Sequence, residues 1–99
     1  MLADWVEWHT SEAPEALRTR VQQHVAGADA RRTVPEALAH AAQAALGRVL
    51  THPGDRSVAL DLLAADALIT LALLAQAERA PDRLAEFAAS ILQSVRPDA

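Results

Sequence analysis

The amino-acid sequence predicts an all-α protein, an up-down four-helix bundle with a short helical segment at its N-terminus. Roughly a quarter of the residues are Ala, a strong helix former, whereas residues that favour strands are scarce: the chain has 1 Phe, 2 Trp and no Tyr. Pro and Gly divide the chain into segments in which apolar residues recur with the period of an α-helix. The 99 residues are enough for one hydrophobic core, so we expect a single domain over residues 1–99.

The N-terminal part of the chain predicts one short helix and one longer helix. Four residues of the short segment, 2–9, share one side of a helical wheel: Leu2, Trp5, Val6 and His9. The longer helix is expected to begin between residues 11 and 14, because Pro14 is tolerated in a first turn, and to stop near Gly27. Its apolar stripe contains Ala13, Leu17, Val21, His24, Val25 and Ala28.

A capping-box pattern predicts the start of the next helix. The Thr33 hydroxyl and the Glu36 carboxylate have the spacing at which each accepts a hydrogen bond from the backbone N–H of the other. The helix is expected to end before residues 52–54, where Pro53 disfavours a helical residue before it and Gly54 permits a sharp reversal. Its buried stripe contains Val34, Leu38, Ala41, Ala42, Ala45, Leu46 and Val49.

The third long helix, expected over 58–77 with Asp55 as its N-cap, is apolar almost all round. Its length would span a bilayer, but Asp61 and Asp66 lie inside it and no Trp or basic residue brackets it, which argues against a transmembrane helix. After a break, Pro81 is expected at the first position of a fourth, amphipathic helix. The inward residues of this last helix are Leu84, Phe87, Ala88, Ile91, Leu92 and Val95.

Composition excludes several classes of function. With 13 acidic and 9 basic residues the net charge is -4, which disfavours nucleic acid as a partner. The absence of Cys removes disulfides, thiolate zinc sites, iron-sulfur clusters and cysteine nucleophiles. The N-terminus carries acids where a secretory signal carries basic residues, so we expect a cytoplasmic protein without a membrane segment. All 9 basic residues are Arg, which together with the Ala content indicates a GC-rich bacterial genome or selection for guanidinium groups.

Few residues are candidates for chemistry. Carboxylate-bridged iron in a helical bundle requires Glu-x-x-His motifs, and the chain has none. Its nearest pattern, Glu36 and His40, falls on the face opposite the buried stripe, so we expect no metal and no cofactor. No Ser has the setting of an activated nucleophile, so we assign no catalytic residue and favour a protein that is not an enzyme.

The polar candidates are His24 and Asp66, each predicted to lie on an apolar stripe. Buried polar groups need partners, so we expect the two side chains to pair. Such a pair would either fix the register of two packed helices or anchor a ligand in an incomplete active site. Arg20, one turn before His24, can also reach Asp66.

The leading functional hypothesis is a non-catalytic protein-protein interaction module that forms a homodimer. The third long helix has more apolar surface than a small bundle covers, and the predicted self-association face consists of Leu60, Ala64, Ala67, Leu68 and Leu71. Trp8 is a candidate exposed contact residue, because Trp is enriched at binding hot spots. The alternative is a bundle that binds a small apolar ligand between its helices, with His24 and Asp66 as polar anchors.

Overall fold

The computed structural model describes residues 1–52, 54 and 56–94 as five α-helices and one short 3-10 turn. The elements are α1 (Leu2–His9), α2 (Glu15–Val25), α3 (Val34–Thr51), α4 (Arg56–Arg79), η1 (Pro81–Arg83) and α5 (Leu84–Ser94). No strand occurs in this part of the chain. The prediction of an all-α helical bundle is confirmed.

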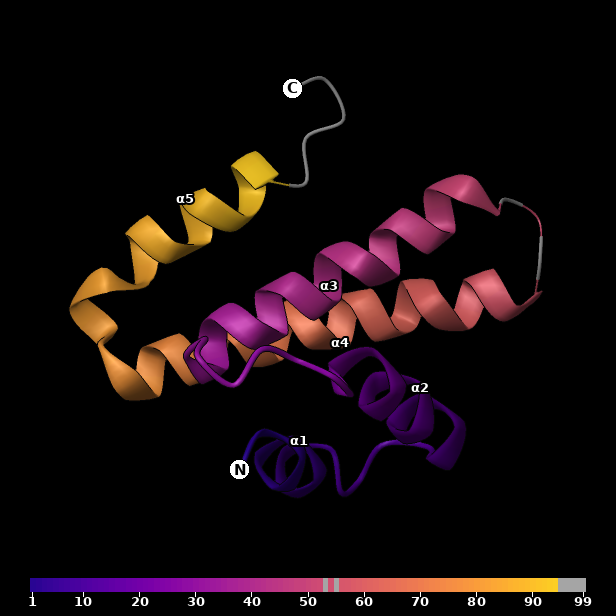
Figure 1. Cartoon of the computed structure of the whole chain (residues 1–99), viewed down its shortest axis with the longest axis horizontal. Coiled ribbons are helices and arrows are strands. Elements are labelled where there is room, and N and C mark those ends of the chain that lie inside the picture. The colour runs from indigo at the N-terminus through magenta and orange to yellow at the C-terminus, as the bar shows by residue number, and fades with distance from the viewer. Residues whose placement is uncertain (53, 55, 95–99) are drawn as a thin grey trace.

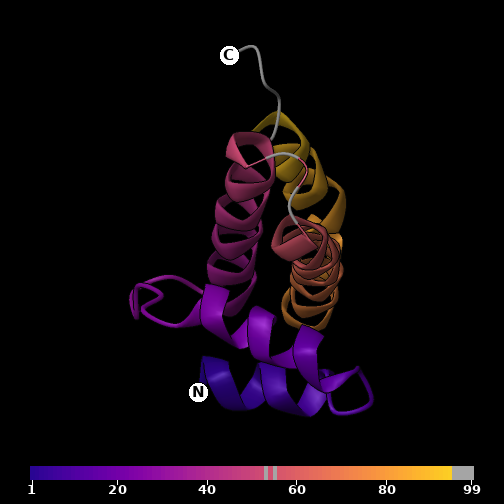
Figure 2. The same ribbon diagram turned by 90° about the vertical axis from the view of Figure 1, so that its right-hand side faces the viewer.

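The two longest helices, α3 and α4, form an antiparallel pair around which the others are arranged (Figure 1). α1 and α2 make a layer that crosses one side of this pair at a steep angle, as the turned view shows (Figure 2). α5 turns back after η1 and ends beside α3, where the Gln43 amide donates a hydrogen bond to the Ser94 hydroxyl. α2 contacts both α3 and α4.

The ends of the helices follow local sequence. The Thr33 capping box is present: its N–H donates to Glu36 Oε1 over 3.0 Å, and the Glu36 N–H donates to its Oγ1 over 3.3 Å. Gly27 and Gly54 adopt left-handed φ values of 81° and 88°, which explains the Gly that follows α2 and α3. Pro81 begins η1, a tight turn that leads directly into α5. The predicted N-cap Asp55 and the predicted inward residue Val95 lie outside the described residues.

The core between α3 and α4 consists largely of small side chains. Buried alanines lie on both helices, which lets the two backbones approach closely: Ala37, Ala41, Ala42 and Ala45 on α3, and Ala64, Ala65, Ala72 and Ala75 on α4. Larger side chains from four helices fill the remaining space, among them Val6, Val21, Leu38 and Leu68. Trp5 is partly buried against this core, so α1 is attached to the rest of the protein through Val6 and Trp5.

α4 is long and apolar enough to cross a membrane if only its length and composition are considered, a property that core helices of soluble proteins share. Of its most apolar 18-residue stretch, 44% is buried in the structure. The compact packing of α4 along α3 is that of a globular protein, and it leaves more than half of that stretch outside the core.

Candidate functional site

The most polar feature of the core is the carboxylate of Asp61 on α4, which has an exposed fraction of 0%. Its Oδ1 accepts hydrogen bonds from Arg20 Nη1 over 2.7 Å and His24 Nε2 over 3.0 Å. Its Oδ2 accepts a hydrogen bond from Arg48 Nε over 3.1 Å. We call these four residues the Asp61 cluster. It joins three helices, because Arg20 and His24 come from α2 and Arg48 from α3.

Helical spacing brings the basic groups to Asp61. Arg20 and His24 are separated by one turn of α2, so both side chains project from the same face. Arg20 Nη1 also donates to the backbone oxygen and the hydroxyl of Ser57, both over 3.2 Å, and thereby holds α2 against the start of α4. Arg48 reaches Asp61 from the last turn of α3.

The negative charge of Asp61 is more than compensated, because two guanidinium groups, those of Arg20 and Arg48, pair with it. Burial by itself raises the pKa of Asp61, but the hydrogen bonds from Arg20, His24 and Arg48 outweigh burial and lower the pKa from 3.8 to about 2. Asp61 is therefore ionised at neutral pH. Both of its oxygens are engaged and none of its surface meets solvent, so the carboxylate is not placed to act on a molecule that arrives from solution. The arrangement fixes how α2, α3 and α4 pack.

The predicted partner of His24 was the wrong aspartate. His24 pairs with Asp61, whereas Asp66 is exposed on the opposite side of α4. Arg20 likewise reaches Asp61 and not Asp66. The cause is the rotation of α4 about its axis: the two aspartates differ by about 140° around a helix with 3.6 residues per turn, so only one of them can face α2.

The sequence contains a signal for Asp61. Together with four residues that follow at intervals of three and four, it makes one stripe along α4: Asp61, Ala65, Leu68, Ala72 and Ala75. All five are buried. Small residues at this spacing indicate the side of an apolar helix that packs closely against a neighbour. An Asp at the head of such a stripe is the residue that needs basic partners.

The predicted self-association face belongs to the core. Ala64, Leu68 and Leu71 are buried, and Leu60 and Ala67 are partly buried. The prediction of this face was therefore wrong. Because α4 is apolar on all sides, its hydrophobic pattern does not specify which side points inward. The packing of alanines against α3 and the pairing of Asp61 determine that side.

The side of α4 that remains exposed is also apolar. Leu62, Leu63 and Leu74 have exposed fractions of 51%, 56% and 40%. Asp66 and Thr70 lie between them along the helix and are exposed as well. These five residues, which we call the outer face of α4, share one side of the helix. The structure thus leaves a stripe of leucines with one charge at its centre in contact with solvent.

Trp8 lies beside the outer face of α4. It is 77% exposed, and with Asp66 and Thr70 it lines a hollow of about 480 Å³ between α1 and α4. Its role as a contact residue stays a prediction. A second groove, of about 870 Å³, lies between α1 and the α2–α3 connection. Trp8 borders both.

The residues considered for metal binding and catalysis are dispersed. Glu36 and His40 are exposed on α3, and the Glu36 carboxylate is engaged in the capping box. Within residues 1–52, 54 and 56–94, no three His, Asp or Glu side chains are grouped so that they could hold a metal ion.

The chain matches no protein-family model, no curated protein and no solved structure.

Proposed function

We propose that this protein is a non-catalytic interaction module of the cytoplasm that forms a symmetric homodimer through the outer face of α4. The observation that carries the proposal is the exposure of Leu62, Leu63 and Leu74 on a helix whose opposite side is fully packed. Large exposed apolar side chains that gather on one side of a helix mark interaction surfaces, and a two-fold axis covers such a surface with an identical one. Trp8 lies at the edge of this surface, where a second copy would contact it.

The order of residues along the outer face suits an antiparallel pair of α4 helices. A two-fold axis level with Leu68 would place Leu62 opposite Leu74, and Leu63 opposite Leu73, of the second copy. Asp66 would then face the Thr70 hydroxyl and not another carboxylate. A parallel pair in register would instead bring the two Asp66 side chains together, which is destabilising in an apolar surrounding. The self-complementary order therefore favours a second copy as the occupant.

The ends of the face carry charges of opposite sign. Arg56 is exposed at the start of α4 and Glu78 is exposed near its end. In the antiparallel arrangement each Arg56 lies near Glu78 of the second copy. Such exposed pairs contribute little to affinity, but they distinguish the antiparallel from the parallel orientation.

Light scattering at micromolar concentration tests the proposal. We expect a particle of twice the chain mass of 10.6 kDa. Leu63→Glu should convert it to a monomer without loss of helical circular dichroism, because the new charge would have to be buried in the interface. Leu92→Glu is the matched control: Leu92 is 63% exposed but lies on α5, away from the outer face. A wild-type monomer, or dissociation by the control variant alone, would refute the interface.

Cysteine cross-linking tests the register, since the chain has no Cys of its own. Asp66→Cys and Thr70→Cys chains should form a disulfide when mixed, because these positions face each other across the axis. Each variant alone should cross-link poorly. Efficient cross-linking of each variant with itself would show a parallel pair and overturn the antiparallel arrangement.

A further inference from the structure

We propose that the groove between α1 and the α2–α3 connection binds a small carboxylate with an apolar tail, and that Arg32 anchors the carboxylate. This site is separate from the outer face of α4. It also differs from the ligand site expected from the sequence, because neither His24 nor Asp66 is among the residues that line it.

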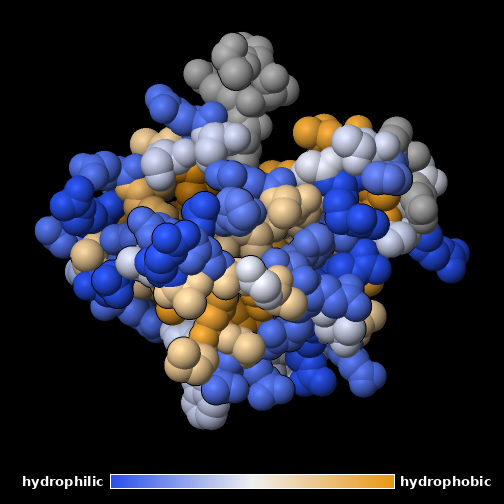
Figure 3. All heavy atoms as spheres, viewed as in Figure 1, coloured by the Kyte–Doolittle hydropathy of each residue, from blue (hydrophilic) through white to orange (hydrophobic). Residues whose placement is uncertain are grey.

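The body of the groove is apolar. Its lining includes Leu2, Trp5, Val25, Val34 and Ala37, contributed by α1, the end of α2 and the start of α3. In the space-filling view, hydrophobic side chains gather between α1 and the α2–α3 connection (Figure 3). Its volume of about 870 Å³ falls within the range of about 300–1,000 Å³ that small-molecule pockets have. An apolar chain fits this lining.

The acidic groups at the groove are already paired. Arg31 donates two side-chain hydrogen bonds to the carboxylate of Asp29, over 3.2 and 3.3 Å, and these lower the pKa of Asp29. Asp4 lies 4.0 Å from the N-terminal ammonium group of Met1. The Glu36 carboxylate, which lies in the first turn of α3 and does not line the groove, accepts the Thr33 N–H. These carboxylates therefore each have a partner within the chain.

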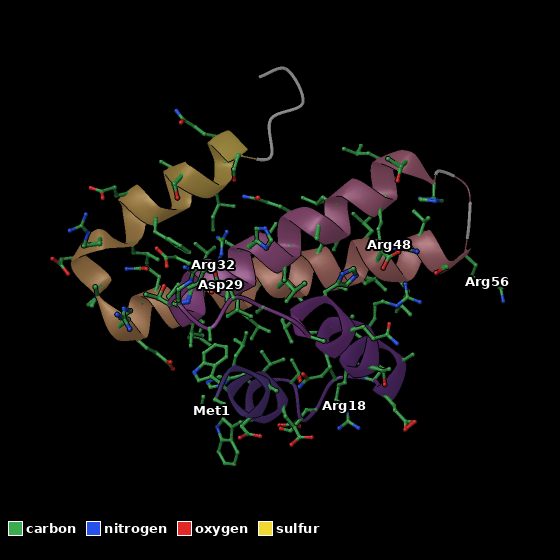
Figure 4. The ribbon with its side chains drawn as sticks, viewed as in Figure 1. Met1, Arg18, Asp29, Arg32, Arg48 and Arg56 are labelled. Carbon is green, nitrogen blue, oxygen red and sulfur yellow. The ribbon has the colours of Figure 1, made fainter. Side chains whose placement is uncertain are left out.

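The charge of Arg32 acts on Asp29 and Glu36, where it adds to the lowering of their pKa that their hydrogen bonds bring about. Its side chain lines the groove, and within the part of the chain that the structure describes its guanidinium makes no hydrogen bond or ion pair. Figure 4 shows Arg32 and Asp29 together on the α2–α3 connection, on the same side of the molecule as Met1. A guanidinium presents a planar pair of N–H donors that matches a carboxylate. An apolar groove with one unpaired guanidinium at its rim selects an apolar carboxylate.

Tryptophan fluorescence reports whether a ligand is bound in the groove. Trp5 and Trp8, the only tryptophans of the chain, both line it. The Trp5 ring stacks on His9 with centroids 3.9 Å apart, and His9 Nδ1 lies within hydrogen-bond distance, 2.8 Å, of the Trp5 carbonyl oxygen. The Trp5 ring is thus held in place, so a ligand that enters the groove changes tryptophan fluorescence.

The experiment is a fluorescence titration with decanoate, decanol and decylammonium, each below its micelle concentration. These probes share one apolar chain and differ in the charge of the head group. We expect saturable binding of decanoate, about tenfold tighter than that of decanol, because a charge-assisted hydrogen bond to Arg32 distinguishes them. Equal affinity for all three probes, or no saturable binding of decanoate, would overturn the proposal.

Substitutions of Arg32 complete the test. Arg32→Gln should weaken decanoate about tenfold and leave decanol unchanged, and Arg32→Glu should reverse the preference toward decylammonium. Arg18→Gln is the matched control, because Arg18 lies on α2 away from the groove and donates only to the Ser11 carbonyl, over 3.3 Å (Figure 4). Loss of decanoate binding in both Gln variants to the same extent would show that net charge, and not Arg32, is responsible.

Discussion

Asp61 and Asp66 lie on the same helix, less than two turns apart, in almost equally apolar sequence, yet their surroundings are opposite. Asp61 is fully buried and accepts hydrogen bonds from Arg20, His24 and Arg48. Asp66 lies in solvent among the leucines of the outer face. One side of α4 is thus a closed contact between helices in which the buried carboxylate is paired with basic groups. The other side is open and has an unpaired apolar surface.

The difference shows what determines which side of an apolar helix is buried and which side faces solvent. Hydrophobicity does not orient α4, because leucines occur all round it. A buried carboxylate without partners is so unfavourable that the helix can turn inward only the aspartate that meets basic groups. The Asp61 cluster therefore excludes other rotations of α4, and the outer face is the surface that remains.

The largest expected effect is the removal of the buried carboxylate. Asp61→Ala should lower the free energy of unfolding by about 3–5 kcal/mol, because it leaves the Arg20 charge uncompensated and the His24 hydrogen bond unmade at the core. Asp66→Ala should change it by less than about 0.5 kcal/mol. Urea denaturation of both variants in the Leu63→Glu background keeps self-association out of the measurement. Equal losses would contradict the distinction between the two sides.

A smaller loss of folding stability is expected at low pH. Because the pKa of Asp61 is lowered from 3.8 to about 2 in the folded protein, its ionised form stabilises the fold. This contribution, about 2 kcal/mol, is complete above pH about 4 and is lost as the pH falls toward 2. Urea denaturation at pH 5, 4, 3 and 2 should show the loss. Asp61→Asn should remove this part of the pH dependence, and an unchanged profile in that variant would assign it to other carboxylates.

The smallest expected effect separates the two aspartates as partners of His24. In a double-mutant cycle, His24→Ala and Asp61→Ala should show a coupling energy of about 1 kcal/mol, since the two side chains share a hydrogen bond of 3.0 Å. His24→Ala and Asp66→Ala should be additive, because these side chains lie on different sides of α4. Coupling of His24 to Asp66 instead would mean that α4 is rotated so that Asp66, and not Asp61, faces α2.

The sequence alone determined the features that depend on neighbouring residues. The helix over 2–9, the Thr33 capping box and the helix ends near Gly27 and before residues 52–54 occur where they were predicted, because each depends on groups within a few positions of one another. His24 was also correctly identified as a polar residue on a packed stripe that requires a partner.

The tertiary structure alone decided which aspartate that partner is and which leucines are exposed. Both depend on the rotation of α4, and a helix that is apolar on every side carries almost no local information about its rotation. The rotation follows from the joint fit of alanines against α3 and of Asp61 against Arg20, His24 and Arg48, residues that lie 13 or more positions away in the chain. The outer face of α4 is exposed because these distant contacts turn the opposite side inward.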